Sequence, residues 1–342
     1  MRSTRRQCLA GIGAATAVSS LSGCLGSSGG DELEELTLAY VPIYPNMQHF
    51  IMEDAGYYRE IPADIDIERF NSGPAVVQAF AGDEVDAAIF GITPSMVLAD
   101  QGKDAAVLAA NSRNGFKIVG TSQLAALYDE HGADAFAQFE AETGRQPQIG
   151  APPDGSVPDV VLRFWIEETL GFEELLEPIE KSQLPPARVP QAIEGGDLDG
   201  AIIQEPFATI ITENDGLREL EWSGDVMTDH PVTVLFVHDR ITNGAPDVAR
   251  SLVDQHDRAT TLANEQPDVA AEHAATVIGD GVGVTLAREA MESKASDFIS
   301  DPAVVSEQTD QMAEYVASLG NTDETIGADR LIDRTVYENV VE

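Results

Sequence analysis

A stretch of fourteen residues has a near-repeat 113 positions further along this chain. The first copy, "QAFAGDEVDAAIFG", covers residues 78–91, and the second, "QAIEGGDLDGAIIQ", covers residues 191–204. Each copy predicts a short helix that ends at a glycine, then an acidic turn and a buried strand. Turns between helices and strands share this chemistry, so chance is one explanation. The matched Gln-Ala and Gly positions, and the strand that follows each copy, favour two α/β lobes of the same topology.

Strand-like and helix-like segments alternate up to residue 243, and the pattern beyond it is helical. Strands are expected at 36–42, 65–71, 86–91, 105–111, 116–122, 148–152, 198–204 and 231–241. Helices are expected at 46–58, 72–82, 93–102, 124–144 and 154–171, with a short one before residue 196. This order predicts mostly parallel sheets with helices on both faces.

The charge of the chain is strongly negative. Acidic residues number 59 against 20 Lys and Arg, which gives −39 in total. Phosphate binding needs Lys and Arg, so we expect no nucleic-acid partner. The acids interleave with apolar periodicity, which favours a folded protein adapted to high salt over a disordered one. At molar salt the Debye length is about 3 Å, and repulsion between surface carboxylates is largely screened.

The first residues are typical of an export signal. Arg5 and Arg6 precede a stretch of small apolar residues, and "LSGC" ends at Cys24. Twin arginines before such a stretch resemble a Tat signal over residues 1–23. The "LSGC" tetrad resembles a lipobox, with Cys24 lipid-modified, and residues 24–35 form a flexible Gly/Ser and acidic tether. The alternative is an ordinary cleaved signal with an incidental cysteine. We expect an exported protein that is anchored to the outer face of the cytoplasmic membrane.

The sequence offers little for catalysis or metal binding. If Cys24 is acylated, no cysteine remains for disulfides, metal or nucleophilic work, because Cys8 lies in the signal. The six histidines show no metal-ligand spacing, and no G-x-S-x-G motif is present. We therefore expect no metal, no cofactor and no enzymatic activity.

Ligands of open parallel sheets bind beyond the carboxyl ends of the strands. In the first lobe this rule selects the loops at 42–46, 71–74, 91–94 and 111–114. In the second lobe it selects 152–156 and 204–207. The candidate ligand-binding residues come from these six loops.

Three of the candidates stand near the start of an expected helix: Ser72, Thr93 and Ser156. Each is a helix cap or, with the free N–H groups of its helix, part of a site for an anionic group. Gly73 and Gly155 allow a close approach of backbone to ligand.

The remaining candidates are polar residues of the same loops. They are Tyr44, Asn46, Asn111, Asp154, Gln204 and Glu205. Tyr44 is a stacking partner or a buried loop aromatic, and Asn46 is a ligand contact or a helix cap. Gln204 is the strongest candidate of the second lobe, because it replaces the final glycine of the first copy of the phrase. Glu205 accepts a hydrogen bond from a ligand or forms a salt bridge at the hinge.

Four segments, in order along the chain, carry a family resemblance. They are "HFIMEDAGYY" (49–58), "AGDEVDAAIFGITP" (81–94), "GAPPDGSVPDVVLRFWIEETLG" (150–171) and "GDLDGAIIQEPF" (196–207). Following an export signal, they resemble the substrate-binding proteins of ABC importers, in the nitrate/sulfonate/taurine and thiamine-precursor group. The whole would be a lipoprotein of the kind found in halophilic archaea.

The resemblance implies a two-lobed α/β fold of the periplasmic-binding-protein type II class. Residues 36–114 and 237–342 would form lobe one, and residues 115–236 lobe two. A monomer would close around a small molecule and deliver it to a membrane permease and its ATPase subunit. The ligand expected from the group is a small anion such as sulfonate, taurine or nitrate. A thiamine-pyrimidine precursor, or an enzyme of the same fold that makes one, is the alternative.

Overall fold

The computed structural model describes residues 33–213, 216–279 and 282–341. The expected export signal and Cys24 lie outside these residues. In the part of the chain that the structure describes, no helix combines the length and apolar character needed to cross a bilayer.

Six strands form the first sheet, in the order β11-β4-β10-β3-β1-β2. They are β1 (Glu35–Tyr40), β2 (Asp64–Arg69), β3 (Ala87–Gly91), β4 (Ala105–Arg113), β10 (Pro231–His238) and β11 (Asp297–Phe298). β1 pairs in parallel with β2 and β3, whereas β10 lies antiparallel between β3 and β4.

Five strands form the second sheet, in the order β7-β6-β8-β5-β9. They are β5 (Lys117–Thr121), β6 (Gln148–Ala151), β7 (Glu180–Gln183), β8 (Gly200–Ile203) and β9 (Leu217–Trp222). β6 pairs in parallel with β7 and β8, and β5 lies antiparallel between β8 and β9. The order β2-β1-β3-β10-β4 of the first sheet is therefore repeated as β7-β6-β8-β5-β9.

The two reversed strands, β10 and β5, enter their sheets from the other sheet. The chain leaves the first sheet after β4 and runs directly into β5, and it returns after β9 into β10. Asn114 N donates to His230 O at 3.1 Å, so the two crossing segments are hydrogen-bonded to each other. The sequence predicts sheets that are mostly parallel, and four strands of each do run one way. The reversed central strand follows from the crossings.

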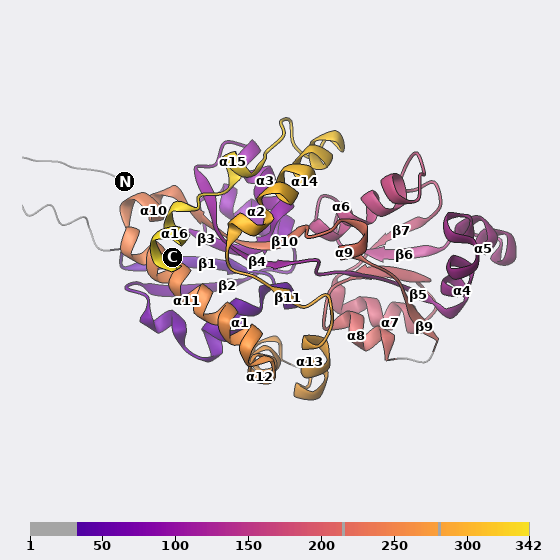
Figure 1. Cartoon of the computed structure of the whole chain (residues 1–342), viewed down its shortest axis with the longest axis horizontal. Coiled ribbons are helices and arrows are strands. Elements are labelled where there is room, and N and C mark those ends of the chain that lie inside the picture. The colour runs from indigo at the N-terminus through magenta and orange to yellow at the C-terminus, as the bar shows by residue number, and fades with distance from the viewer. Residues whose placement is uncertain (1–32, 214–215, 280–281, 342) are drawn as a thin grey trace, which may run out of the picture. The chain divides into compact units, whose positions relative to one another are not determined.

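The helices cover both sheets (Figure 1). Beside the first sheet lie α1 (Met47–Asp54), α2 (Gly73–Ala81), α3 (Ile92–Asp100), α10 (Asp239–Gly244), α11 (Pro246–Glu265), α12 (Pro267–Ile278), α13 (Val284–Met291), α14 (Ser306–Ser318), α15 (Ala328–Leu331) and α16 (Thr335–Val341). Beside the second lie α4 (Ser122–His131), α5 (Ala135–Thr143), α6 (Val157–Phe164), α7 (Val189–Glu194), α8 (Phe207–Thr212) and α9 (Ser223–Val226).

The repeated phrase occupies equivalent places in the two sheets. Its strands are β3 and β8, and its aspartates, Asp86 and Asp199, precede them. Asp86 N donates to Thr37 O, and the Asp86 carboxylate accepts from Thr37 N at 2.9 Å. Asp199 makes the same pair of bonds with Gln148, its carboxylate accepting from Gln148 N at 2.8 Å. The repeated phrase therefore ties the turn before β3 to β1 and the turn before β8 to β6, which hold equivalent positions in the two sheets.

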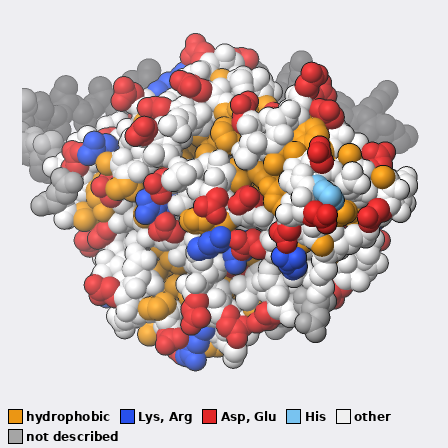
Figure 2. Space-filling view, turned by 45° about the vertical axis from the view of Figure 1, so that its right-hand side comes forward, with side chains coloured by type: hydrophobic (Ala, Val, Ile, Leu, Met, Phe, Trp, Pro, Cys, Tyr) orange, Lys and Arg blue, Asp and Glu red, His pale blue; other side chains and the backbone are white. Residues whose placement is uncertain are grey.

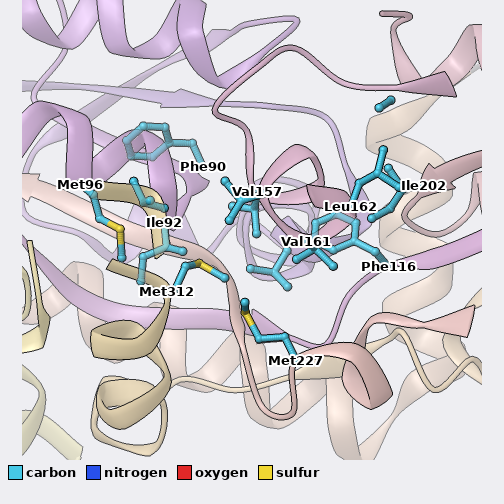
Figure 3. Packing of buried hydrophobic residues seen from close by; sticks show 14 of the residues in the cluster. Phe90, Ile92, Met96, Phe116, Val157, Val161, Leu162, Ile202, Met227 and Met312 are labelled. Carbon is cyan, nitrogen blue, oxygen red and sulfur yellow. The ribbon is translucent and has the colours of Figure 1, made fainter. Parts of the chain in front are cut away.

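One apolar cluster continues from the first sheet to the second. Figure 3 shows Phe90, Ile92 and Met96 on one side of Val157, with Val161, Leu162 and Phe116 on the other. All of these side chains are at most 2% exposed. A second cluster packs α1, α11 and α12 against the other face of the first sheet. Burial of this kind contributes about 1.5–3 kcal/mol per large side chain.

The strands sort into two groups close to the expected lobes. β1–β4 and β11 fall within 36–114 and 237–342, apart from the first residue of β1, and β5–β9 fall within 115–236. β10, which the expected boundary divides at Phe236, lies wholly in the first sheet. The lobe boundaries themselves remain a prediction.

Candidate functional site

A cavity of about 350 Å³ lies where strand ends of both sheets meet. From the first sheet it is lined by residues that follow β1 and β2 and by the last residue of β3: Val41, Ile43, Asn71, Ser72, Gly73 and Gly91. From the second it is lined by the end of β7 and residues after β6, β7 and β8, among them Pro152, Ser156, Gln183, Leu184 and Gln204. The cavity therefore stands at the carboxyl ends of three equivalent strands in each sheet, where ligands of α/β sheets bind.

The crossing segments complete the cavity. Phe116 stands just before β5, and Val232 and Thr233 stand at the start of β10. Neither crossing segment could be placed from the sequence pattern. The strand-end rule does not select the loop that follows β7 either, because the sequence pattern predicts no strand at Glu180–Gln183.

The lining is apolar with a few neutral polar groups. Twelve of its twenty residues are apolar, and six of these are prolines: Pro94, Pro152, Pro153, Pro158, Pro185 and Pro186. The polar members are Asn71, Ser72, Ser156, Gln183, Gln204 and Thr233. No Asp, Glu, Lys, Arg or His belongs to the lining that the described residues form.

Ser72 and Gly73 line the cavity where α2 begins. Ser72 is the residue before the helix and has an extended backbone, but its hydroxyl makes no capping bond. Gly73 lies against Pro94, and a Cβ at this position would come within 3.0 Å of Pro94 Cγ. The loop after β2 thus brings a hydroxyl and a close backbone approach to the cavity wall.

The hydroxyl groups of Ser156 and Thr233 donate their protons to backbone carbonyl groups of the protein. Ser156 Oγ donates to Pro153 O at 2.6 Å. Thr233 Oγ1 donates to Pro45 O at 2.7 Å and lies 3.1 Å from Ser112 Oγ, which donates to it. A hydroxyl has one proton, so both residues present only acceptor capacity to the cavity.

Gln204 and Glu205 follow β8 but differ in role. Gln204 is 2% exposed and lines the cavity. Glu205 does not line it: one carboxylate oxygen accepts from Thr209 N at 2.9 Å, and the other lies 3.3 Å from Lys117 Nζ. Glu205 therefore joins the start of α8 to β5 through a buried ion pair, and both partners belong to the part of the chain that forms the second sheet rather than to the two sides of the hinge.

Thr93 and Asp154 are engaged with protein groups. Thr93 is fully buried within the first turn of α3, and its Oγ1 donates to Gly155 O at 2.8 Å. Gly155 has φ +76, a left-handed conformation that glycine adopts without strain. Asp154 is exposed and pairs with Lys181 at 2.5 Å and Arg163 at 3.7 Å. Neither Thr93 nor Asp154 belongs to the cavity lining.

Tyr44, Asn46 and Asn111 are buried in the first lobe and do not line the cavity. Tyr44 Oη donates to Ala287 O at 2.6 Å, and burial raises the pKa of its phenol. Asn46 Nδ2 donates to Val41 O and Ile89 O, which ties the ends of β1 and β3 together and leaves no capping bond. Asn111 was expected in a loop, but β4 extends through it to Arg113.

His230 stands behind Phe116 and adds no charge there. Its ring stacks on Phe116 with centroids 6.1 Å apart. Burial lowers the pKa of His230 to about 4, so the ring is neutral at pH 7. Over the described residues, no cluster of His, Cys, Asp and Glu could hold a metal ion.

Two mixed sheets of one strand order, crossed twice by the chain and enclosing a cavity at their strand ends, define the periplasmic-binding-protein fold. The chain belongs to the NMT1-like family, whose model matches residues 29–279. This confirms the resemblance seen in the four sequence segments.

Solved structures of similar fold include binding proteins of several importers. The periplasmic nitrate-binding protein NrtA from Synechocystis PCC 6803 has a TM-score of 0.74 and 16% identity, over 90% of this chain and 88% of that one. A ligand-binding component of an ABC-type import system from Staphylococcus aureus has a TM-score of 0.72 and 15% identity, over 90% and 99%. The alkanesulfonate-binding protein SsuA from Xanthomonas axonopodis pv. citri has a TM-score of 0.69 and 14% identity, over 88% and 98%.

A curated relative is the nitrate import ATP-binding protein NrtC of Synechocystis sp., 21% identical over 247 residues. The match covers 69% of this chain but 36% of that protein. The chain therefore spans little more than a third of the relative's length.

Proposed function

We propose that this protein is the extracytoplasmic solute-binding component of an ABC importer, which captures a small molecule between two lobes and delivers it to a permease. The observation that carries the proposal is the cavity at the carboxyl ends of three equivalent strands in each sheet. The NMT1-like family, and the nitrate- and sulfonate-binding proteins of similar fold, support it.

The division into lobes suits capture by closure. The proposed lobes are residues 36–114 with 237–342 and residues 115–236, except that β10 places residues 231–236 with the first lobe. They are joined by the crossing segments at Asn114 and His230, which are hydrogen-bonded to each other. Bending at two adjacent crossings would open and close the cavity.

The proposed setting is the outer face of the cytoplasmic membrane. A Tat-type signal would export the folded chain, and a lipid on Cys24 would hold it near its partners, a permease and an ATPase subunit. The monomer would carry one ligand at a time. The cavity favours binding over the enzymatic alternative, because acid–base and nucleophilic chemistry would need a titratable side chain or thiol beside the ligand.

Two measurements test the proposed function: the mass of a small molecule that co-purifies with the protein, and the uptake of that molecule by cells. The protein should be purified in molar KCl and examined by native mass spectrometry for a co-purifying small molecule. A strain that lacks the gene should lose uptake of that molecule. Gln204→Ala should weaken its binding by about 5- to 150-fold, as expected for a lost hydrogen bond in a closed site. Unchanged uptake in the deletion strain would reject the importer role, and a bound molecule chemically altered by the protein would indicate an enzyme.

A further inference from the structure

The ligand cavity holds no counter-charge for an anion. Two cations close to Phe116 in the chain are paired with carboxylates: Lys117 Nζ lies 3.3 Å from Glu205 and 3.8 Å from Glu219. Arg113 lies 2.7 Å from Asp297 and 3.1 Å from Asp229. Neither side chain belongs to the lining. A buried anion without a counter-charge is costly, and a chain of net charge −39 adds to that cost.

The cavity is also poor in free hydrogen-bond donors. Ser156 and Thr233 give their protons to protein carbonyl groups. α2 and α6 begin at the cavity, but Pro74 and Pro158 each remove one N–H from the first turn. The six prolines of the lining contribute no N–H at all. Sites for sulfonate, phosphate or nitrate depend on several converging N–H groups, and these prolines reduce the number that the wall can offer.

The groups that remain suit a neutral ligand. They are the side-chain amides of Asn71 and Gln204 and the hydroxyl of Ser72, whereas the side chain of Gln183 is hydrogen-bonded to Asp154. An amide offers donors and an acceptor together, so it can pair with a carbonyl, a ring nitrogen or another amide without a charge on either side.

The volume of the cavity and its apolar wall also favour a neutral organic ligand. A volume of about 350 Å³ has room for roughly a dozen water-sized groups at about 30 Å³ each. A nitrate ion would leave most of it empty between apolar walls. Phe116, Leu184 and Ile43, with the proline rings, provide apolar contacts for a ring or a branched aliphatic chain.

We infer that the ligand is an uncharged, largely apolar organic molecule with one or two hydrogen-bonding groups, rather than the small anion expected from the sequence resemblance. The inference rests on the proposed solute-binding function and concerns the chemistry of its ligand. Apolar surface on both partners leaves water, and Gln204 orients the polar end.

Matched pairs of probes test the ligand class. Calorimetry in molar KCl should compare benzamide with benzoate and toluene-4-sulfonamide with toluene-4-sulfonate, with sodium nitrate as a third anion. The neutral member of each pair should bind at least about tenfold more tightly, with a negative heat-capacity change. Nitrate should show no heat of binding. Tighter binding of the anions would overturn the inference and leave solute capture intact.

A second test inserts a charge in the cavity wall and measures whether the preference between the same neutral and anionic probes changes. Leu184→Lys places an ammonium group at the cavity and should invert the preference toward benzoate. Leu176→Lys is the matched control, because Leu176 is 58% exposed and outside the lining, and it should keep the neutral preference. Circular dichroism checks that both variants fold. If Leu184→Lys does not fold, Ser72→Lys replaces it at a half-buried lining position that makes no capping bond.

The charge of the co-purified ligand distinguishes a failure of the ligand-class inference from a failure of the proposed solute-binding function. A neutral molecule released from the native protein supports the inference, and an anion overturns it without touching the importer role. If no molecule co-purifies and neither probe class binds the folded protein, both the ligand class and the proposed solute-binding function are wrong.

Discussion

Thr93 Oγ1 donates a hydrogen bond of 2.8 Å to Gly155 O and thereby joins α3 beside the first sheet to the loop after β6 of the second. Both groups stand next to cavity-lining residues, Pro94 and Ser156. A residue expected to touch the ligand therefore holds the two walls of the site together instead.

Thr93→Val should remove this hydrogen bond between the two sides of the cavity. The change leaves Gly155 O without its partner, so we expect the free energy of unfolding to fall by about 1–3 kcal/mol. Urea unfolding in molar KCl measures it. Thr276→Val is the control, because Thr276 is exposed and its hydroxyl bonds only to its own helix. Equal losses in the two variants would mean that the inter-sheet bond adds nothing.

Asp86 and Asp199 should contribute about equally to the free energy of unfolding. Each carboxylate accepts a hydrogen bond from a backbone N–H of the neighbouring strand, β1 or β6, and another from an arginine: Arg240 Nε at 2.8 Å for Asp86, and Arg145 Nη2 at 3.0 Å for Asp199. Asp86→Asn and Asp199→Asn should each lower the free energy of unfolding by about 1–3 kcal/mol. Asp66→Asn, on an exposed position of β2, should stay within about 0.5 kcal/mol. A large effect at only one aspartate would contradict the equivalence of the two turns.

Stability should fall below neutral pH because of buried histidines. Burial lowers the pKa of His230 to about 4 and that of His256 to about 3. Below about pH 6.5 these histidines bind protons in the unfolded chain, whereas the buried rings stay neutral in the folded protein. Their contribution to the free energy of unfolding is therefore complete above that pH and is lost as the pH falls. Each histidine should account for about 2 kcal/mol between pH 7 and pH 5.

His256→Leu isolates one of these contributions. Neither ring nitrogen of His256 has a hydrogen-bond partner among the described residues, so an apolar side chain fits its surroundings. The variant should unfold at higher urea than the wild type at pH 5, and the gap should narrow at pH 7. His131→Leu, at a partly exposed position, should leave the pH dependence unchanged. An unaltered pH profile in His256→Leu would refute the assignment.

The acidic surface predicts a requirement for salt. Figure 2 shows Asp and Glu side chains spread over one face, with few Lys and Arg among them. Lowering the salt to 0.1 M lengthens the Debye length to about 10 Å and restores their repulsion. The melting temperature should fall steeply between 3 M and 0.1 M KCl. A flat profile would remove the case for adaptation to high salt.

Lipid attachment at Cys24 is testable in cells. Cys24→Ser should release the protein into the medium or block its processing, and the wild-type mass should show a lipid at the first mature residue. Retention at the membrane with an unchanged mature mass would contradict the anchor.

Local patterns in the sequence determined much of this protein. The repeated phrase predicted two lobes of one topology, and its strands proved to be β3 and β8, at the same position in two sheets of the same order. The rule that ligands bind at strand ends selected Ser72, Gly73, Ser156 and Gln204 from the sequence, and all four line one cavity. Periodicity and turn chemistry depend on neighbouring residues, so they can be read without a structure.

Only the tertiary structure decided which candidate groups are free. Tyr44 bonds to Ala287, 243 positions away, and Thr93 to Gly155, 62 positions away, so neither hydroxyl faces the cavity. The reversed strands β5 and β10, which place Phe116 and Thr233 in the wall, likewise follow from the path of the chain between sheets. A polar side chain serves whichever partner the fold brings within about 3 Å, and that partner is set by packing between distant segments rather than by the residues beside it.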